Sequence, residues 1–207
     1  MSITRQPIVH EQGPVPRRAS DDVEHRFVRV EHEHRLETLI DELRRERGLT
    51  LVFVRTKHGA DRLVKRLGRH GIEAVAMHGN NSQRQREHPL GRFESGAVNT
   101  LVATDIAARG IDISGVSHVI NFDPPADSET YVHRIGRTGR AGAKGIGITL
   151  VAPAEHGDVT KVAETLGLDH GLPHSAVQHR SGRPSRTHRN APRARRRPNR
   201  RRTPTRS

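Results

Sequence analysis

Short apolar runs alternate with amphipathic segments through the middle of this chain. The runs have the length of buried strands, and we predict strands over 25–30, 49–54, 73–77, 100–103, 116–122 and 147–151. Between them apolar residues recur three or four positions apart, as Leu36, Leu39 and Leu43 do, which is typical of a helix that buries one face. Strands that alternate with helices predict an α/β domain in three layers, with a mostly parallel central sheet covered on both faces.

Capping residues predict where two of the helices begin. Ser82 with Gln85 three residues later is a capping-box signal. Pro89 falls inside this helix, and because a proline costs about 3 kcal/mol in a helix interior, the pattern leaves the geometry around Arg86 open. Ser128 is predicted to cap a short helix that leads into the basic segment after it.

Composition separates the predicted domain from both ends of the chain. Residues 1–22 contain Pro and Gly without an apolar period, so we predict a disordered leader or a truncated interdomain linker. Residues 23–170 are predicted to fold as one domain. Residues 171–207 are rich in Arg, Pro, Ser and Thr, a composition that buries no core, so a disordered Arg-rich tail is predicted.

The positive charge of the chain is concentrated in this tail. The 207 residues carry 36 Lys+Arg and 23 Asp+Glu, a net charge of +13. Twelve arginines lie between Arg180 and Arg206, where there is no Asp, Glu or Lys, so the rest of the chain holds 24 basic and 23 acidic residues. The net charge is therefore no evidence that the domain binds nucleic acid. The tail is either a solubilising end or, as we predict, a polycation that binds RNA nonspecifically through counterion release.

Several classes of site are excluded by residues that the sequence lacks. It has no cysteine, which excludes disulfides, thiolate nucleophiles and cysteine zinc sites. Its 15 histidines are scattered without metal-ligand spacing, so no metal site is predicted in this chain. No apolar run approaches the length of a membrane span, and the first residues lack the apolar block of a signal peptide. We therefore expect a cytoplasmic protein with no membrane partner.

The most informative segment is the octapeptide His-Arg-Ile-Gly-Arg-Thr-Gly-Arg at 133–140. It places Arg137 and Arg140 three residues apart on a turn that Gly136 and Gly139 keep free of side-chain bulk. Arginine is always charged and offers a planar fork of donors, so paired arginines on such a turn suit a phosphate ligand. The phosphate-cradling loop G-x-x-x-x-G-K-[ST] is absent, because the chain contains no Gly-Lys dipeptide.

Five further motifs precede the octapeptide in a defined order. They are Leu-Val-Phe-Val-Arg-Thr-Lys at 51–57, Met-His-Gly at 77–79, Ser-Gln at 82–83 with Arg86, Ala-Thr-Asp-Ile-Ala-Ala-Arg-Gly-Ile-Asp at 103–112 and Val-Ile-Asn-Phe-Asp at 119–123. Over about residues 23–166 this set closely resembles the second RecA-like domain of the DEAD-box ATP-dependent RNA helicases. The resemblance implies a single RecA-like domain that forms the C-terminal half of such a helicase.

The resemblance also implies a nucleotide site shared between two domains. Arg137 and Arg140 correspond to arginine fingers that stabilise charge on the γ-phosphate of ATP. Gly110 and Asp112 correspond to the contact with the nucleotide, Asp112 at the ribose. ATP with Mg²⁺ would be held largely by a first domain that this chain lacks. The residues implied in coupling the two domains are His133 and Asp105.

An RNA cleft is implied by the same resemblance. Its contacts go to the phosphate backbone, so binding should be largely independent of sequence. The residues implied are Arg55, Gly79, Gln83, Arg86 and Thr104.

Several of these roles have a plainer structural alternative. Gln83 and Arg86 would otherwise be the polar residues that an exposed helix needs in any case. Arg137 and Arg140 would otherwise form a solvent-facing basic turn, with His133 packed beneath it. Asp112 would be a turn or capping carboxylate, and Thr104 a hydroxyl at the end of a strand.

Two functions remain open from the sequence. The Asp-Glu pair at 41–42 lies on the flank of a predicted helix and is no Asp-Glu-Ala-Asp box, so the catalytic elements of a first domain have no counterpart. The chain is either the C-terminal half of an ATP-dependent RNA helicase, inactive unless a first RecA-like domain is supplied in trans, or a non-catalytic RNA-binding or regulatory module that keeps the fold.

Overall fold

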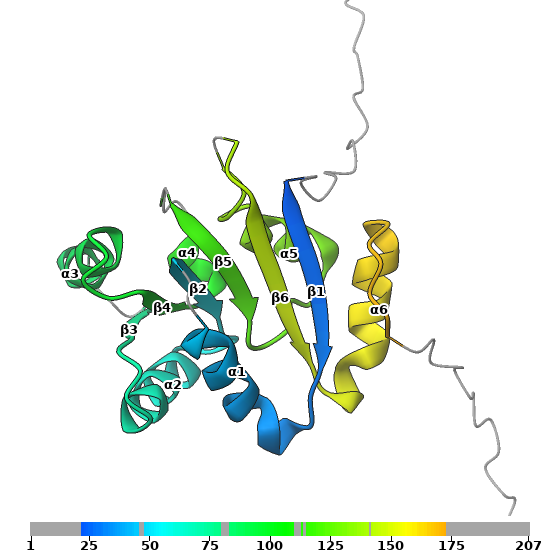
Figure 1. Cartoon of the computed structure of the whole chain (residues 1–207), viewed down its shortest axis with the longest axis horizontal. Coiled ribbons are helices and arrows are strands. Elements are labelled where there is room, and N and C mark those ends of the chain that lie inside the picture. The colour runs from blue at the N-terminus through cyan, green and yellow to red at the C-terminus, as the bar shows by residue number, and fades with distance from the viewer. Residues whose placement is uncertain are drawn as a thin grey trace, which may run out of the picture. The chain divides into compact units, whose positions relative to one another are not determined.

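A parallel sheet lies at the centre of the domain (Figure 1). The computed structural model describes residues 22–45, 48–79, 83–109, 113, 115–140 and 142–172, and only the backbone at 83 and 84. Within this part of the chain six strands form one sheet in the order β1-β6-β5-β2-β4-β3, and every neighbouring pair is parallel. The strands are β1 (Val23–Arg29), β2 (Leu49–Phe53), β3 (Val75–Met77), β4 (Thr100–Ala103), β5 (Val116–Asn121) and β6 (Gly145–Val151).

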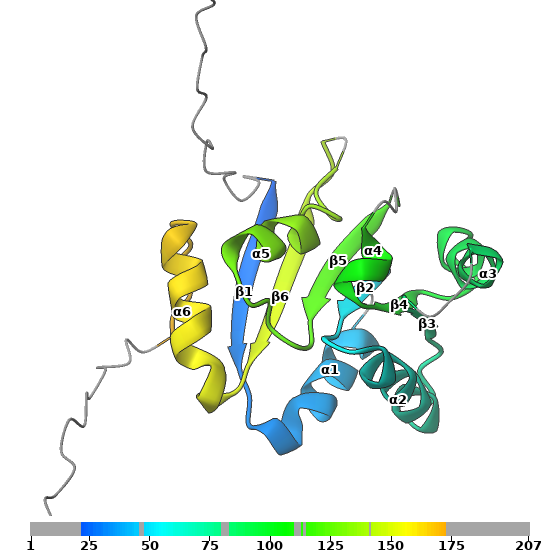
Figure 2. The same ribbon diagram turned by 180° about the vertical axis from the view of Figure 1, so that it is seen from behind.

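Helices cover both faces of the sheet (Figures 1 and 2). The α-helices are α1 (Arg35–Arg44), α2 (Lys57–Arg69), α3 (Gln83–Glu94), α4 (Asp105–Ala108), α5 (Ser128–Ile135) and α6 (His156–Thr165). Two short 3-10 helices, η1 (His32–His34) and η2 (Pro153–Glu155), precede α1 and α6. The buried residues of α1 and α2 form one core cluster with the sheet, whereas those of α3, α4 and α5 contribute to another.

Alternation along the strands divides their side chains between these two cores. Leu51 and Phe53 of β2 belong to the core under α3, α4 and α5, whereas Val52 and the following Val54 belong to the core under α1 and α2. Burial on both faces explains why β2 reads as a nearly continuous apolar run. The predicted three-layer α/β fold with a mostly parallel sheet is confirmed.

Three strands begin at other residues than predicted, and β1, β2 and β5 each end one residue earlier. β1 and β6 each begin two residues earlier than predicted, because their register pairs Val23 with Gly145 and the two strands extend together. Polar residues near the start of β1 and glycines near the start of β6 interrupt the apolar pattern, so the pattern did not indicate where these strands begin. β3 is shorter than predicted and pairs with β4 from Val75 onward.

Pro89 does not interrupt α3. The helix runs from Gln83 to Glu94, with Phe93 fully buried and Leu90 packed against the same core. This burial offsets the hydrogen bond that a proline removes from the helix ladder. Arg86 therefore lies in a regular helix. Ser82, the predicted cap, lies outside the described residues.

Asp127, and not Ser128, caps α5. The Asp127 side chain accepts a hydrogen bond of 2.7 Å from the backbone N–H of Thr130, while Ser128 is the first residue inside the helix. The prediction of a Ser128 cap was wrong because either residue suits the position, and the entry of the chain into the helix selects the aspartate. A carboxylate at this end also interacts favourably with the helix dipole.

Asp127→Ala is expected to lower the free energy of unfolding by about 1 kcal/mol, and Asp127→Asn by much less. The hydrogen bond from the Thr130 N–H lowers the pKa of Asp127 from its ordinary value. A lowered pKa contributes stability above the ordinary Asp range, and this is lost as the pH falls through the folded-state pKa. Urea titrations at neutral pH and below about pH 4 test this: the advantage of wild type over Asp127→Asn should shrink in acid, and a constant difference would contradict it.

None of the helices in the described part of the chain has the length and apolar content needed to cross a bilayer. At the end of that part, Leu172 is buried in a small cluster with Val151 and Val159. The other residues of the predicted tail after Leu172, and all of the predicted leader before Asp22, lie outside the described residues.

Candidate functional site

The carboxyl ends of neighbouring parallel strands bring most of the candidate residues to one edge of the sheet. Arg55 follows β2, Gly79 follows β3, Thr104 and Asp105 follow β4, and Asp123 follows β5. Because all of these strands run in the same direction, their ends meet at a common edge, where ligands of such sheets bind. The C-terminal part of α5 adds Arg134 to this edge, and the turn after the helix adds Arg137.

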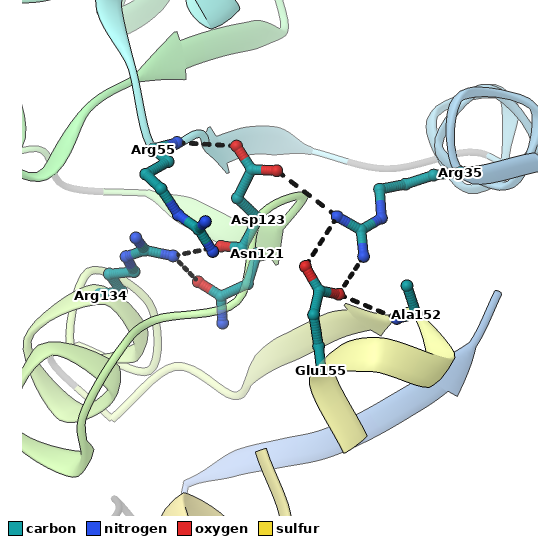
Figure 3. Close-up of polar contacts among 7 residues, drawn as sticks. All are labelled: Arg35, Arg55, Asn121, Asp123, Arg134, Ala152 and Glu155. Atoms are coloured by element: carbon teal, nitrogen blue, oxygen red, sulfur yellow. Dashed lines mark hydrogen bonds and ion pairs between the residues drawn. The ribbon is translucent and has the colours of Figure 1, made fainter. Parts of the chain in front are cut away.

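Arg134 is the central residue of the edge. Its side chain is only 4% exposed, and its Nε and Nη2 donate to the two carboxylate oxygens of Asp105 at 2.6 and 2.9 Å. Its Nη1 donates to Asn121 Oδ1 at 3.1 Å and to the backbone oxygen of Asp123 at 2.7 Å (Figure 3). The guanidinium also lies 5.0 Å from the centre of the Phe53 ring. One side chain therefore joins α5 to the ends of β2, β4 and β5.

A second buried arginine lies on the far side of Asp123 (Figure 3). The Asp123 carboxylate accepts a hydrogen bond of 2.8 Å from the backbone N–H of Arg55, and Arg35 Nη1 lies 3.5 Å from its other oxygen. Arg35 also forms an ion pair with Glu155, whose carboxylate accepts the backbone N–H of Ala152. These contacts fix the loop after β6 against α1 and the end of β5.

The turn after α5 is fixed by internal packing. Thr138 is buried, and its hydroxyl donates to the backbone oxygen of Val116 at 2.6 Å. Gly139 has φ +65°, and a Cβ there would lie 2.6 Å from Val23. Arg140 Nε donates to the Gly136 oxygen at 2.8 Å. The requirement for glycine at 139 thus comes from the positive φ of the turn and from the approach of β1.

Arg137 and His133 line a small cavity together with Arg134 and Asp105. The cavity holds about 20 Å³, room for about one water molecule. Arg109 adds a further cation to its wall, while Arg140 is not among the lining residues. The structure thus brings His133, Asp105 and Arg137 together. The Asp105 carboxylate there is engaged by the buried Arg134.

The predicted RNA-binding residues differ in exposure. Arg55 and Gly79 are exposed at the edge of the sheet, whereas Thr104 is 7% exposed and precedes α4 as its N-cap residue. Arg86 is half-buried on α3, and the neighbouring α4 carries Ile106 with 68% of its surface exposed.

Three predicted residues cannot be placed in the site. Gly110 and Asp112 lie outside the described residues, as does the side chain of Gln83. The predicted ribose contact therefore stays a prediction. Within the described ranges, no group of three His, Asp or Glu side chains is arranged to hold a metal ion.

The model of the helicase conserved C-terminal domain family matches residues 33–142. The chain belongs to this family. Over 117 residues it is 52% identical to the DEAD-box ATP-dependent RNA helicase CshA of Geobacillus kaustophilus, a match that covers 56% of this chain and 25% of that protein. This helicase domain thus corresponds to about a quarter of its curated relative.

Solved structures of DEAD-box proteins share the fold of this helicase domain. The E. coli DEAD-box protein SrmB, bound to regulator of ribonuclease activity A, is 39% identical with a TM-score of 0.68, and the match covers 72% of this chain and 88% of that one. S. cerevisiae Dbp5, bound to RNA and ADP BeF3, is 32% identical with a TM-score of 0.66, over 72% of this chain and 40% of that one. The predicted membership of the DEAD-box family is confirmed.

Two residues that organise this helicase domain, Arg134 and Asn121, were not among the predicted site residues. Both are buried, and Asn121 also donates to Thr149 Oγ1 at 3.0 Å. A signal for Arg134 exists in the sequence, because helical spacing places it on the same face as Tyr131 and Ile135. A charged residue on an apolar helix face requires buried partners.

Proposed function

We propose that this domain supplies the arginines of an ATPase site and one half of an RNA-binding cleft, both completed by a first RecA-like domain. The observation that carries the proposal is the placement of Arg137 beside His133 and the Asp105–Arg134 ion pair, at the edge where parallel strands end. A guanidinium held there meets the requirement for stabilising charge on a transferring phosphoryl group.

The side chains around the cavity at Arg137 suit one side of a nucleoside triphosphate site that two domains share. Cations predominate around the cavity at Arg137, which suits phosphate oxygens. The cavity of about 20 Å³ is far smaller than the roughly 300–1,000 Å³ of a cleft that encloses a ligand. This supports a site closed by a second domain. In this arrangement Arg137 and Arg140 would contact the terminal phosphate, Gly110 and Asp112 the nucleoside, and Mg²⁺ would be held by the other domain.

RNA is the proposed second ligand of the same edge. Arg55, Gly79 and Thr104 would contact successive backbone phosphates, with Gln83 and Arg86 on α3 beside them. Dbp5, which has the same fold, was solved with RNA and ADP BeF3, and this supports both ligands for the present domain. Contacts of this kind bind RNA with little sequence preference.

An ATPase assay with the domain alone and with an added first RecA-like domain of a DEAD-box helicase tests the proposal. The domain alone is expected to show no turnover, and RNA-stimulated turnover is expected when both domains are present. Strong turnover by this chain alone would refute the proposal. RNA binding without restored turnover would instead support a non-catalytic RNA-binding or regulatory module.

The Arg-rich tail is proposed to add nonspecific RNA affinity. Removing residues 173–207 eliminates all 12 arginines between Arg180 and Arg206. The deletion is expected to weaken RNA binding and to flatten its salt dependence, because fewer counterions are released. Fluorescence anisotropy with labelled oligouridylate across a salt series measures both quantities. Unchanged affinity and slope would show that the tail only solubilises the chain.

A further inference from the structure

A second cavity lies between α1 and α2, and it shares no lining residue with the cavity at Arg137. It holds about 210 Å³ and is open at the surface where β5 ends. We call it the α1–α2 pocket; its walls include Leu36, Leu63, Phe122, Arg62, Arg66 and Arg35. Small-molecule clefts usually enclose roughly 300–1,000 Å³. The α1–α2 pocket therefore suits one large side chain better than a whole cofactor.

The mouth of the α1–α2 pocket is positively charged. Arg62 and Arg66 lie one turn apart on α2, both are exposed, and neither forms an ion pair with a described residue. The helix carries five Lys or Arg residues and a single acid, Asp61, which pairs with His78 at 3.1 Å. The carboxylate in the wall, Asp123, is already engaged by Arg35 and by the Arg55 N–H. A ligand therefore meets two exposed cations that have no ion-pair partner in the described part of the chain, which favours an acidic partner.

The inner wall of the α1–α2 pocket is apolar. Leu36 and Leu63 are buried side chains of α1 and α2, and Phe122 is half-buried beside them. The Arg35 guanidinium lies 5.9 Å from the centre of the Phe122 ring. Arg35 therefore covers one face of the Phe122 ring, and a base cannot stack on that face. The apolar wall and the occupied ring favour a protein ligand over RNA.

We propose that the α1–α2 pocket docks an acidic segment of a partner protein, which inserts one apolar side chain between Leu36, Leu63 and Phe122. Carboxylates that flank the inserted side chain would pair with Arg62 and Arg66. The combination of an apolar anchor with charged neighbours follows the usual anatomy of peptide recognition. This interaction requires neither ATP nor a first RecA-like domain, so it stands or falls independently of the proposed ATPase role.

Fluorescence anisotropy with the full chain and a labelled short peptide of Asp and Glu around one Phe tests the proposal. Replacing Phe by Ala in the peptide is expected to weaken binding about tenfold or more, because the apolar anchor is lost. The double variant Arg62→Glu/Arg66→Glu is expected to weaken binding of the Phe peptide by a similar factor. The matched control Lys65→Glu/Arg69→Glu changes the same charge on exposed positions of α2 that do not line the pocket.

The control separates the pocket from general electrostatic attraction. All variants keep the Arg-rich tail, so binding by the tail contributes equally to each of them. Equal weakening in both double variants, or no effect of the Phe-to-Ala change, would overturn the proposal. Competition by unlabelled oligouridylate that depends on Arg62 and Arg66 would overturn it in favour of an RNA surface.

Discussion

Arg134→Met is expected to lower the free energy of unfolding by about 3 kcal/mol, the largest stability effect of any single replacement at the edge of the sheet. The methionine keeps much of the side-chain volume but removes every donor of the guanidinium. Asp105 then loses its bidentate ion pair with Arg134, and Asn121 Oδ1 loses the donor that reaches it at 3.1 Å. Polar groups left without partners in buried surroundings account for the expected loss.

Three further variants separate the ion pair from a general effect of losing charge. Arg109→Met removes an exposed arginine from the same cavity and should change stability by no more than about 0.5 kcal/mol. Arg134→Lys keeps the charge but not the fork, so it should resemble Arg134→Met. Adding Asp105→Asn to Arg134→Met should recover part of the loss, because the unpaired carboxylate is gone. Urea titrations followed by circular dichroism give the free energies of unfolding of all four variants. Equal stabilities for Arg134→Met and Arg109→Met would disprove the stabilising role of the buried Arg134 contacts.

Much of the fold could be predicted from the sequence because strands β2, β4, β5 and β6 are largely buried on both faces. A run such as 49–54 identifies a parallel strand without any knowledge of its neighbours, and the spacing of Leu36, Leu39 and Leu43 identifies the buried face of α1. The ends of elements were less predictable, because they depend on pairing. Val23 belongs to β1 through its register with Gly145, which lies more than a hundred positions later in the chain.

The candidate site was predictable only where a short motif carries the chemistry. Arg137 could be found from its spacing to Arg140 and to the glycines. Arg134 could not be assigned partners, because Asp105, Asn121 and Asp123 come from two other strand ends and meet only in the folded sheet. A structural constraint on Gly139 was missed for the same reason: a Cβ there would approach Val23, which no local pattern reveals.

Arg137→Ala is expected to reduce the RNA-stimulated ATPase of the two-domain mixture by roughly 10³-fold or more, in line with the loss of an arginine finger. The proposed role is stabilisation of charge that develops on the phosphoryl group, so kcat should fall much more than the affinity for RNA or nucleotide changes. Arg137→Lys restores the charge but not the planar fork, and it should recover only a small part of the rate.

The matched control for this prediction is Arg69→Ala, which removes an exposed arginine from the last turn of α2, outside both cavities. It should leave turnover unchanged, and a thermal melt should show that both variants remain folded. Separating the effect on kcat from an effect on assembly requires titration with the first domain: a true arginine finger lowers the plateau rate, whereas a contact between domains shifts the midpoint. If Arg137→Ala shifts the midpoint and keeps the plateau, Arg137 holds the two domains together and another group stabilises the transferring phosphate.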